Sequence, residues 1–564
     1  MKLQKYTYNI VAILSFLTLT NCQDLNYDED TGNTKEDIFN DIGRSKQFLS
    51  GIYAYLPTDY GSIDGAMRST ATDEAVNVND LASVQKFNDG SWNAVQQLDN
   101  VWATMYNGIR AVNVYLKEAE GQTFPDQQYT TTYANLIKQF NNYPYEARFL
   151  RAYFYFELVK RYKNVPLIKT VLTADEAVNV EQATFEEVVD FIVNECDAVA
   201  AVLPVTYVDF GGASETGRAT KGAALALKAR ILLYAASPLH KPTPDLELWK
   251  KAASAAKEVI DLAVSAKYSL APSYSSNFNM LVASPTTEII LERRVAASND
   301  FERRNYPIGY EGGGTGTCPT QNLVDSYEMS RNGLPITNPS SRYNPLQPYS
   351  GRDSRLAQTV ILNNTIWKDK TIQTFNGGTN GLPLLNATKT GYYLKKYVIE
   401  GINLDTKLGT VTTREHNWIL FRYAEVLLNY AEAMNEAYGP QTPPVGGGLT
   451  ALEAVNIVRR RANGAGFIFP NGMTKDDFRT KLRNERRVEL AFEDHRFWDI
   501  RRWKIGEQTK EIYQIKITRA ADLSFIYEKT LLETRVFQDR MNLYPIPQSE
   551  IFKSNGKLEQ NEGW

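Results

Sequence analysis

Residues 484–503 read NERRVELAFEDHRFWDIRRW, and ten of these twenty residues are charged. Two carboxylates with separated pKa values that face an open cleft can act as general acid and general base. Here, however, Phe478, Leu482, Glu485 and Glu489 fall on one side of a predicted helix, which carries the carboxylates close to a core. A buried carboxylate needs a partner, and arginine supplies planar, bidentate donors. The candidate partners are Arg459, Arg460, Arg461, Arg486 and Arg487. We therefore interpret the segment as an ion lattice that supports packed helices.

Other signals of catalysis are weak. The three histidines lack metal-ligand spacing such as H-E-x-x-H, and they are His240, His416 and His495. The glycines of GGGTG at 312–316 precede Cys318 and Pro319 rather than a helix, so we interpret them as a flexible turn and not as a phosphate loop. A glycosidase needs a pair of carboxylates, but 65 acidic residues offer so many pairs that none stands out. The sequence predicts no enzyme, no cofactor and no metal site.

The composition is that of a globular protein with a sizeable core, since 43% of the 564 residues are hydrophobic and 23% are charged. The net charge of −3 lacks the basic footprint of a nucleic-acid-binding protein, so no nucleic-acid partner is predicted. Tyrosine is unusually frequent, with 33 copies, and a surplus of aromatic side chains favours a binding surface, although core aromatics contribute to the same count.

The N-terminus reads MKLQKYTYNIVAILSFLTLTNC. Lys2 and Lys5 precede a mostly apolar run from Ile10 to Leu19, which is shorter than the roughly 20 residues that span a bilayer. This pattern is typical of an export signal, which we place at residues 1–21.

The end of that signal, LTNC, resembles a bacterial lipoprotein box and predicts that Cys22 is acylated as the first mature residue. A plain secretory signal followed by a chance cysteine is the alternative. The next residues are polar and acidic, so residues 22–40 are predicted to form a flexible tether. Of the other two cysteines, Cys196 continues an apolar helical series and is interpreted as a small buried residue. Whether it pairs with Cys318 is left open.

Amphipathic helices dominate the rest of the chain. Thr184 with Glu187, and Thr450 with Glu453, form capping boxes that predict the starts of two helices.

Apolar stripes at helical spacing cover residues 224–234, 249–263 and 420–434, and the alanines of the second stripe allow a neighbouring helix to approach closely. Adjacent amphipathic helices predict helical hairpins. Their succession indicates tetratricopeptide-like packing, in which each pair buries its face against the next.

Residues 270–412 differ, because Gly, Pro, Ser, Asn and aromatic residues crowd between short strand-like runs such as TTEIILERRV and GYYLKKYVI. We predict a loop-rich insertion with short strands, between a helical N-terminal region at 41–269 and a helical C-terminal region at 413–564. The predicted fold class is mainly α, with tetratricopeptide-like helix pairs. Loops on a rigid scaffold often carry binding residues, so the ligand is expected at the insertion.

The segment at 484–503 is very similar to the C-terminal signature of the SusD/RagB family of surface lipoproteins, which serve starch-utilisation-type glycan uptake systems. Further landmarks of that family occur in the same order: WATMYNGIRAVN at 102–113, EARFLRAYFYFELVKRYKNVPLI at 146–168, PTQNLVDSYEM at 319–329, FRYAEVLLNYAEAMNEA at 421–437, YPIPQSEI at 544–551 and the ending LEQNEGW. The resemblance covers essentially the whole chain after the signal.

This resemblance implies a SusD-like fold of four tetratricopeptide-like pairs that support a variable region. It implies that acylated Cys22 anchors the protein in the outer membrane, facing outward, and that a SusC-like TonB-dependent β-barrel transporter is the partner. Members of the family capture oligosaccharides, or occasionally peptides and other nutrients, close over the barrel like a lid, and are generally not enzymes. The implied function is delivery of oligosaccharide or polysaccharide nutrients to the transporter. The alternatives are a peptide or other nutrient as ligand, a pure protein-interaction scaffold, or a surface glycosidase.

Candidate ligand-binding residues are loop aromatics beside amides, because sugar rings stack on aromatic faces while their hydroxyls need polar partners. Trp92 and Asn93 lie in NDGSWNAVQQ, Tyr310 opens YEGGG, and Trp367 follows NNTI. Each aromatic also has a structural alternative, as a helix-start staple, a loop anchor and the core of a strand, respectively. Sites in the family draw aromatics from a similar N-terminal loop and from the insertion, so we expect the three to be exposed. Trp102 matches a scaffold motif and is expected to be buried.

Overall fold

The computed structural model describes residues 34–207, 215, 217–278 and 286–564. The predicted signal, Cys22 and the tether as far as residue 33 lie outside the described residues. The last part of the predicted tether is helical instead, in α2 (Lys35–Phe39). Thr34 and Asp37 form a capping box at its start, and Phe39 is buried in the core.

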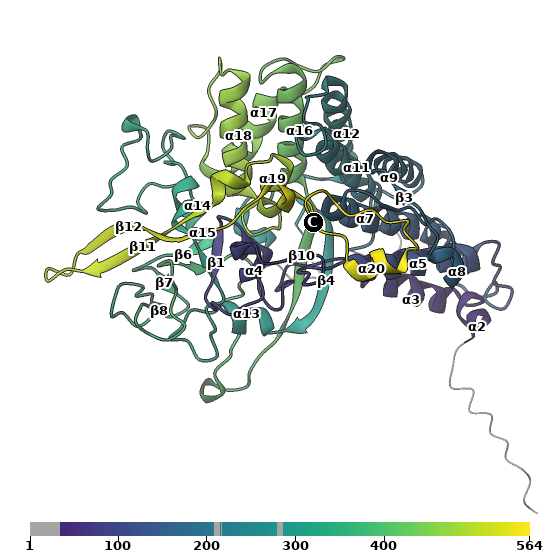
Figure 1. Ribbon diagram of the computed structural model, residues 1–564, viewed down its shortest axis with the longest axis horizontal. Coiled ribbons are helices and arrows are strands. Elements are labelled where there is room, and N and C mark those ends of the chain that lie inside the picture. The colour runs from purple at the N-terminus through teal and green to yellow at the C-terminus, as the bar shows by residue number, and fades with distance from the viewer. Residues whose placement is uncertain (1–33, 208–214, 216, 279–285) are drawn as a thin grey trace, which may run out of the picture.

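The protein is mainly helical, as predicted (Figure 1). The longer helices are α3 (Ile42–Tyr53), α5 (Trp102–Ala119), α6 (Tyr133–Phe140), α7 (Tyr143–Tyr162), α9 (Phe185–Ala200), α11 (Lys221–Ala236), α12 (Leu246–Ala266), α16 (Tyr423–Tyr438), α17 (Ala451–Asn463) and α18 (Lys475–Glu489). The shorter ones are α4 (Gln85–Asp89), α8 (Ala174–Ala177), α13 (Asp300–Asn305), α14 (Gln321–Ser326), α15 (Leu356–Thr359), α19 (Arg496–Arg502) and α20 (Gln548–Lys553).

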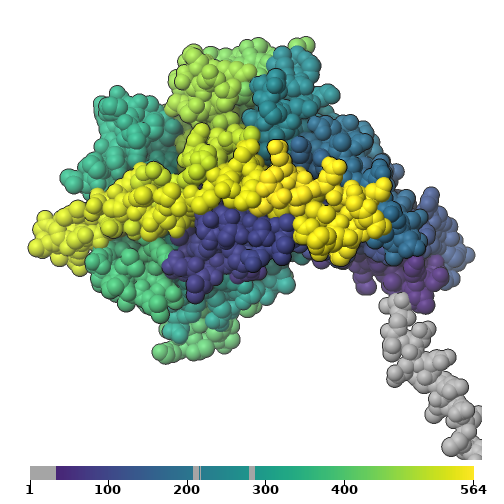
Figure 2. All heavy atoms as spheres, viewed as in Figure 1, coloured from purple at the N-terminus to yellow at the C-terminus, as the bar shows by residue number. Residues whose placement is uncertain are grey.

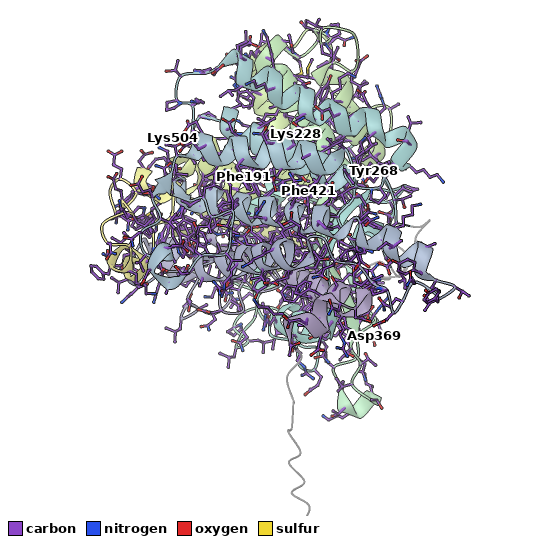
Figure 3. The ribbon with its side chains drawn as sticks, turned by 90° about the vertical axis from the view of Figure 1, so that its right-hand side faces the viewer. Phe191, Lys228, Tyr268, Asp369, Phe421 and Lys504 are labelled. Carbon is purple, nitrogen blue, oxygen red and sulfur yellow. The ribbon has the colours of Figure 1, made fainter. Side chains whose placement is uncertain are left out.

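The long helices pack in chain order, each against the next. Contacts join α5 to α7, α7 to α9, α9 to α11, α11 to α12, and α12 to α16, which in turn packs on α17 and α18. In Figure 1 these helices rise along the right-hand side from α5 to α12, and Figure 3 shows them from that side as stacked layers. Helix α7 lies inside this stack and is buried along nearly its whole length. The arrangement confirms the predicted succession of packed helix pairs.

Both predicted capping boxes are present. The Thr184 hydroxyl accepts a hydrogen bond from the Glu187 N–H at 3.2 Å, and the Glu187 carboxylate accepts one from the Thr184 N–H at 2.8 Å. Thr450 and Glu453 form the same pair of bonds at 3.1 and 2.8 Å. Two of the four N–H groups that a helix start leaves without intrahelical partners are therefore satisfied in each case.

The strands form two-stranded antiparallel sheets. The pairs are β1 (Ala75–Asn77) with β5 (Thr317–Pro319), β2 (Val165–Pro166) with β3 (Gln182–Ala183), β4 (Ile289–Ser298) with β10 (Arg414–Arg422), β6 (Val360–Ile361) with β9 (Tyr393–Leu394), β7 (Ile366–Trp367) with β8 (Lys370–Thr371), and β11 (Glu511–Arg519) with β12 (Phe525–Thr534). The predicted strand in TTEIILERRV is β4, and its partner β10 lies beyond the predicted insertion. A strand pair therefore ties the insertion to the C-terminal helices.

The acidic segment is buried and paired with arginines. Arg355 Nη1 lies 2.5 Å from Glu485 Oε1 and 2.7 Å from Glu489 Oε2, although the sequence did not identify it as a partner. Arg459 lies 2.7 Å from Glu485, and Arg461 contacts Glu489, as predicted. Burial opposes ionisation of Glu489, but the surrounding guanidinium groups outweigh it and hold its pKa well below the usual value.

The other predicted arginine partners are placed differently. Arg486 pairs with Asp499 at 3.2 Å and Arg487 with Asp73 at 3.0 Å, while Arg460 is exposed on α17. The segment is thus an ion lattice within the packing of the helices, as we interpreted it.

The C-terminal segment crosses the molecule after α19. Figure 2 shows it running over the front of the molecule, across segments from the first part of the chain. It begins with the hairpin β11–β12, which projects from the body at the left of Figure 1 and was not predicted. It continues to α20, which lies beside α5. The C-terminal segment therefore lies beside a helix from the first quarter of the chain.

Cys196 and Cys318 are both buried and free. The structure thus answers the question left open by the sequence, and Cys196 is a small core residue as expected.

Candidate ligand-binding site

Trp92, which we expected to be an exposed aromatic, is only 2% exposed. Its ring contacts those of Phe87, Tyr544 and Trp564 at centroid distances of 4.7, 5.2 and 4.5 Å. The prediction of exposure is wrong because the C-terminal segment covers the loop that carries Trp92. Such a contact between distant parts of the chain has no signature in the sequence near Trp92.

The neighbouring Asn93 is half-buried and holds its own turn. Its Oδ1 accepts hydrogen bonds from the N–H groups of Val95 and Gln96, both at 2.9 Å. Its Nδ2 donates to the Ser91 carbonyl oxygen at 3.3 Å. The side chain has a structural use here, of the kind that asparagine often has in turns.

Trp367 is also only 2% exposed, so the prediction of exposure fails here too. The rings of Tyr306 and Tyr310 pack edge-on against it, at 4.8 and 4.7 Å. Tyr310 is half-buried and donates a hydrogen bond from its hydroxyl to the Trp367 carbonyl oxygen at 2.7 Å, and burial raises its pKa to about 12. The structure thus brings Tyr310 and Trp367 together as a structural cluster, while Trp92 belongs to a different one.

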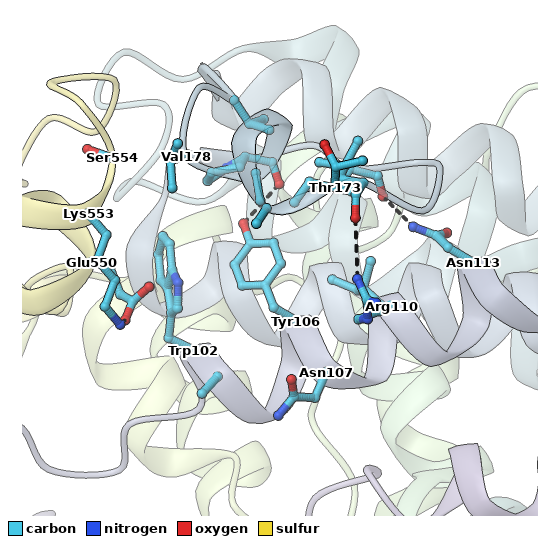
Figure 4. Close-up of a pocket in the computed structure, with 18 of the residues that line it drawn as sticks. Trp102, Tyr106, Asn107, Arg110, Asn113, Thr173, Val178, Glu550, Lys553 and Ser554 are labelled. Atoms are coloured by element: carbon cyan, nitrogen blue, oxygen red, sulfur yellow. Dashed lines mark hydrogen bonds and ion pairs between the residues drawn. The ribbon is translucent and has the colours of Figure 1, made fainter.

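A pocket of about 690 Å³ lies elsewhere, between α5, the segment that joins β2 to β3, and α20 (Figure 4). We call it the α5 pocket. Trp102, Tyr106, Asn107 and Arg110 of α5 form one side of it, and parts of residues 167–181 and of α20 form the other sides. Its size falls within the range of roughly 300–1,000 Å³ that is usual for small-ligand sites. Trp102 is 5% exposed, so it is buried as predicted, yet its ring lines this pocket.

Aromatic and polar side chains meet on the α5 side of the pocket. The rings of Trp102 and Tyr106 lie 5.1 Å apart, and both project from the helix into the space shown in Figure 4. Within the described chain, neither the Trp102 indole N–H nor the Asn107 amide has a hydrogen-bond partner. Because Trp102 is largely buried, the half-buried ring of Tyr106 supplies most of the accessible aromatic surface. An aromatic ring beside free donors and acceptors is the chemistry that sugar rings require.

Residues 167–181, which include α8, form a cover over the pocket. The short ladder between β2 and β3 closes the two ends of this cover segment. Asn113 and Arg110 of α5 donate to its backbone carbonyls at Thr170 (2.9 Å) and Leu172 (3.4 Å), and Tyr106 donates to the carbonyl of Pro166, directly before it, at 2.9 Å. Burial raises the pKa of Tyr106 well above its usual value, so its hydroxyl stays a donor. The helix thus both lines the pocket and fixes its roof.

The α20 wall carries the remaining charges. Lys553 and Glu550 form an ion pair at 2.9 Å, and both face the pocket together with Ser554 (Figure 4). Arg110 is exposed and, in the part of the chain that the structure describes, has no carboxylate partner. Of the described residues that line the pocket, Glu550 alone is acidic. The site offers hydrogen-bond donors and a cation, with a single carboxylate that is already paired.

Sequence reasoning missed this site because its residues lie in WATMYNGIRAVN, which we assigned to the scaffold. A signal was present in the spacing. Tyr106, Arg110 and Asn113 follow Trp102 at offsets of 4, 8 and 11 residues, which places them on one face of a helix. A stripe that mixes aromatic with polar side chains in this way faces a partly open space more often than a core.

The charged segment at 484–503 offers no comparable opening. It borders a cavity of about 30 Å³, whose lining includes Glu157, Lys160, Glu493 and His495. That volume accommodates about one water molecule. Among the described residues, no group of three or more His, Cys, Asp or Glu side chains is arranged to hold a metal ion. No helix in the described ranges combines the length and apolarity that a membrane span requires.

Comparisons with known protein families cover most of the chain. Residues 287–564 match the model of the SusD family, and residues 27–233 match a second model, described as starch-binding and associating with the outer membrane.

Similar structures agree over nearly the full length. A crystal structure of a SusD-like protein from Bacteroides fragilis is 27% identical, with a TM-score of 0.76, over 94% of this chain and 98% of that one. A SusD-like carbohydrate-binding protein from the same species is 26% identical, with a TM-score of 0.74, over 92% and 99% of the two chains.

A curated relative matches more locally. SusD-like protein P2 of Formosa agariphila is 32% identical over 155 residues, a stretch that spans 26% of either chain. The helical fold, the two family models and the similar structures agree with the landmarks found in the sequence. The chain belongs to the SusD/RagB family.

Proposed function

We propose that this protein is a cell-surface lipoprotein that binds oligosaccharide or polysaccharide nutrients in the α5 pocket and delivers them to a SusC-like TonB-dependent transporter. The observation that carries the proposal is the meeting of Trp102 and Tyr106 with the free Asn107 amide and Arg110 in one pocket. Membership of the family supports it, and one similar structure is that of a carbohydrate-binding protein.

The lipid anchor is part of the same proposal. Cys22 precedes the cap of α2 at Thr34 by 12 residues, which extend to at most about 40 Å. An acylated Cys22 then holds the folded body within a short distance of the outer membrane, on its outward face, where the transporter would lie.

Binding without hydrolysis is the expected chemistry of the pocket. Glycosidases use two carboxyl groups on either side of the scissile bond. The α5 pocket has Glu550, which the ammonium group of Lys553 pairs at 2.9 Å. This arrangement favours a binding protein over a glycosidase.

A peptide is the second candidate ligand, because much of the pocket wall is aliphatic. The apolar side chains of Leu172, Val178, Val180 and Leu558 line it opposite the aromatic rings. Such a wall also accepts the hydrophobic side chains of an extended peptide, so both ligand classes belong in the test.

The experiment uses the soluble form that lacks residues 1–22. Calorimetry and affinity electrophoresis against soluble starch, pullulan, xylan, laminarin, pectin, alginate and a mixed peptide library identify what binds. Asn107→Ala is expected to weaken that binding by about 1–3 kcal/mol without lowering Tm, since its side chain is exposed. Arg110→Ala should weaken binding by a similar amount and lower Tm slightly, because it also removes the bond to Leu172. Arg460→Ala, which removes an exposed arginine of α17, is the matched control. Unchanged binding in both pocket variants, or binding of peptides alone, contradicts the proposal.

A further inference from the structure

A second hollow lies on the other side of the first turn of α5. It has a volume of about 440 Å³ and is lined by residues 54–58, 62–64 and 97–101 and by Arg68, Thr104, Met105 and Arg161. We call it the loop pocket. Its floor is closed by Asp99, which pairs with Arg68 at 2.7 Å and with Arg161 at 2.9 Å. The carboxylate of Asp99 is therefore paired with two guanidinium groups and is not available to a ligand.

The rim of the loop pocket is rich in unoccupied polar groups. Within the residues that the structure describes, the hydroxyls of Thr58 and Thr104 and the carboxylate of Asp64 have no hydrogen-bond partner. Asp64 and Thr104 are exposed and Thr58 is half-buried. Hydroxyl and carboxylate side chains pair well with the hydroxyl groups of a sugar. The loop pocket therefore complements the α5 pocket, which supplies the aromatic and apolar surface.

Both pockets are built on the same turn of the same helix. Trp102, Ala103 and Tyr106 line the α5 pocket, while Thr104 and Met105 line the loop pocket. A helix with its side chains is about 10–12 Å across, so the two hollows are neighbours. The ridge between them consists of Ala103 and Thr104, which are exposed and small. The linings of the two pockets thus adjoin at these two exposed residues.

We propose that a single extended oligosaccharide, longer than a disaccharide, occupies both pockets and crosses α5 over Ala103 and Thr104. This inference rests on the proposed function and adds to it that the ligand is recognised as a polymer segment. The α5 pocket stacks a sugar ring on the half-buried ring of Tyr106, and the loop pocket binds hydroxyl groups through Thr58, Asp64 and Thr104. Linking two weak sites through one ligand raises affinity steeply with ligand length, until both pockets are filled.

The test measures affinity against ligand length. Fragments of increasing length are prepared by partial hydrolysis of whichever polysaccharide of the panel above binds, and each is titrated into the soluble form by calorimetry. The affinity is expected to rise at least tenfold between fragments that fill one pocket and those that reach both. Thr104→Trp raises the ridge, so it should reduce the affinity for long fragments towards that for fragments that fill only the α5 pocket.

Two controls make the result specific. Thr104→Ala keeps the ridge low and removes one hydroxyl of the loop pocket, so it should weaken the binding of long fragments far less than Thr104→Trp does. Thr480→Trp places the same large side chain at an exposed position of α18 and should leave binding unchanged. Affinity that does not change with length, or a Thr104→Trp variant that binds long fragments like the unchanged protein, overturns this inference and leaves the proposed function standing. Absence of binding to every polysaccharide overturns both.

Discussion

The indole ring of Trp92 packs against that of Trp564, with the ring centroids 4.5 Å apart and the ring planes inclined by 60°. Phe87 and Tyr544 close two further sides of the same cluster. The cluster fastens the C-terminal segment onto a loop from the first hundred residues. Trp92 is thus a structural tie between distant parts of the chain, and this role leads to the first prediction.

Trp92→Ala is expected to lower the free energy of unfolding by about 3–5 kcal/mol, because it leaves a cavity in a closely packed cluster. Urea denaturation followed by circular dichroism measures the change. Tyr129→Ala removes an aromatic ring that is 89% exposed and should change the free energy little. If both variants unfold at the same urea concentration as the unchanged protein, the structural role of Trp92 is refuted.

Tyr106→Phe is expected to loosen the cover of the α5 pocket. The substitution keeps the ring that lines the pocket but removes the hydroxyl that donates to the Pro166 carbonyl oxygen at 2.9 Å. The free energy of unfolding should fall by about 1 kcal/mol, and hydrogen exchange should become faster in residues 167–181 while helix α7 is unaffected. Tyr129→Phe is the matched control. If hydrogen exchange in residues 167–181 is as slow in Tyr106→Phe as in Tyr129→Phe, the Tyr106 hydroxyl does not hold the cover.

Acid should destabilise the protein partly through Glu432. Burial opposes ionisation of this carboxyl, but Arg502, which contacts it at 2.6 and 2.7 Å, outweighs burial and lowers its pKa from 4.5 to about 2. A depressed pKa means that the stabilisation is complete above the unfolded-state pKa and is lost as the pH falls from about 4.5 to about 2. Glu432→Gln should therefore lower the free energy of unfolding at pH 7 by about 3 kcal/mol and flatten its dependence on pH in that window. The same slope in the variant and the unchanged protein would show that another group is responsible.

The thiols of Cys196 and Cys318 should be unreactive in the folded protein. Both are buried and free, and burial raises the pKa of each thiol. In the soluble form lacking residues 1–22, a thiol reagent should label neither residue within minutes, and both after unfolding, while a reductant leaves Tm unchanged. Rapid labelling of either cysteine in the native state would contradict this placement.

Cys22→Ala should release the protein from the membrane. Stable anchoring requires more than one acyl chain, which a lipoprotein cysteine provides, and no described helix can replace it. Detergent phase separation of cells that express each form measures the partition. Unchanged membrane partition of the variant would show that the protein is held in another way.

The sequence predicted the helical scaffold well because local rules determine it. The boxes at Thr184 and Thr450, and the alanine stripe of α12, depend on residues within a few positions of each other. The hairpin β11–β12 was missed although EIYQIKITR alternates apolar with polar residues, a pattern that indicates a strand. Because the preceding segment has a helical signature, we predicted the whole C-terminal region to be helical.

The site was harder to predict because exposure is a property of the whole fold. In sequence, Trp92 and Trp367 resemble exposed binding aromatics, because each lies among polar residues in a predicted loop. Their burial depends on Trp564 and on Tyr306, which lie far away along the chain. Conversely, Trp102 lies in a helix motif and was correctly predicted to be buried, but only the positions of α20 and of the cover segment show that it lines a pocket.

The contribution of α20 to the α5 pocket has a consequence for how the protein matures. The pocket needs α5 near residue 102 and α20 near residue 550, so it is absent until nearly the whole chain has folded. If the α5 pocket binds ligand as proposed, a chain that lacks its C-terminal segment should bind that ligand weakly, because the wall formed by α20 is missing. Under the proposed function, ligand binding would therefore report that the two distant parts of the chain have come together.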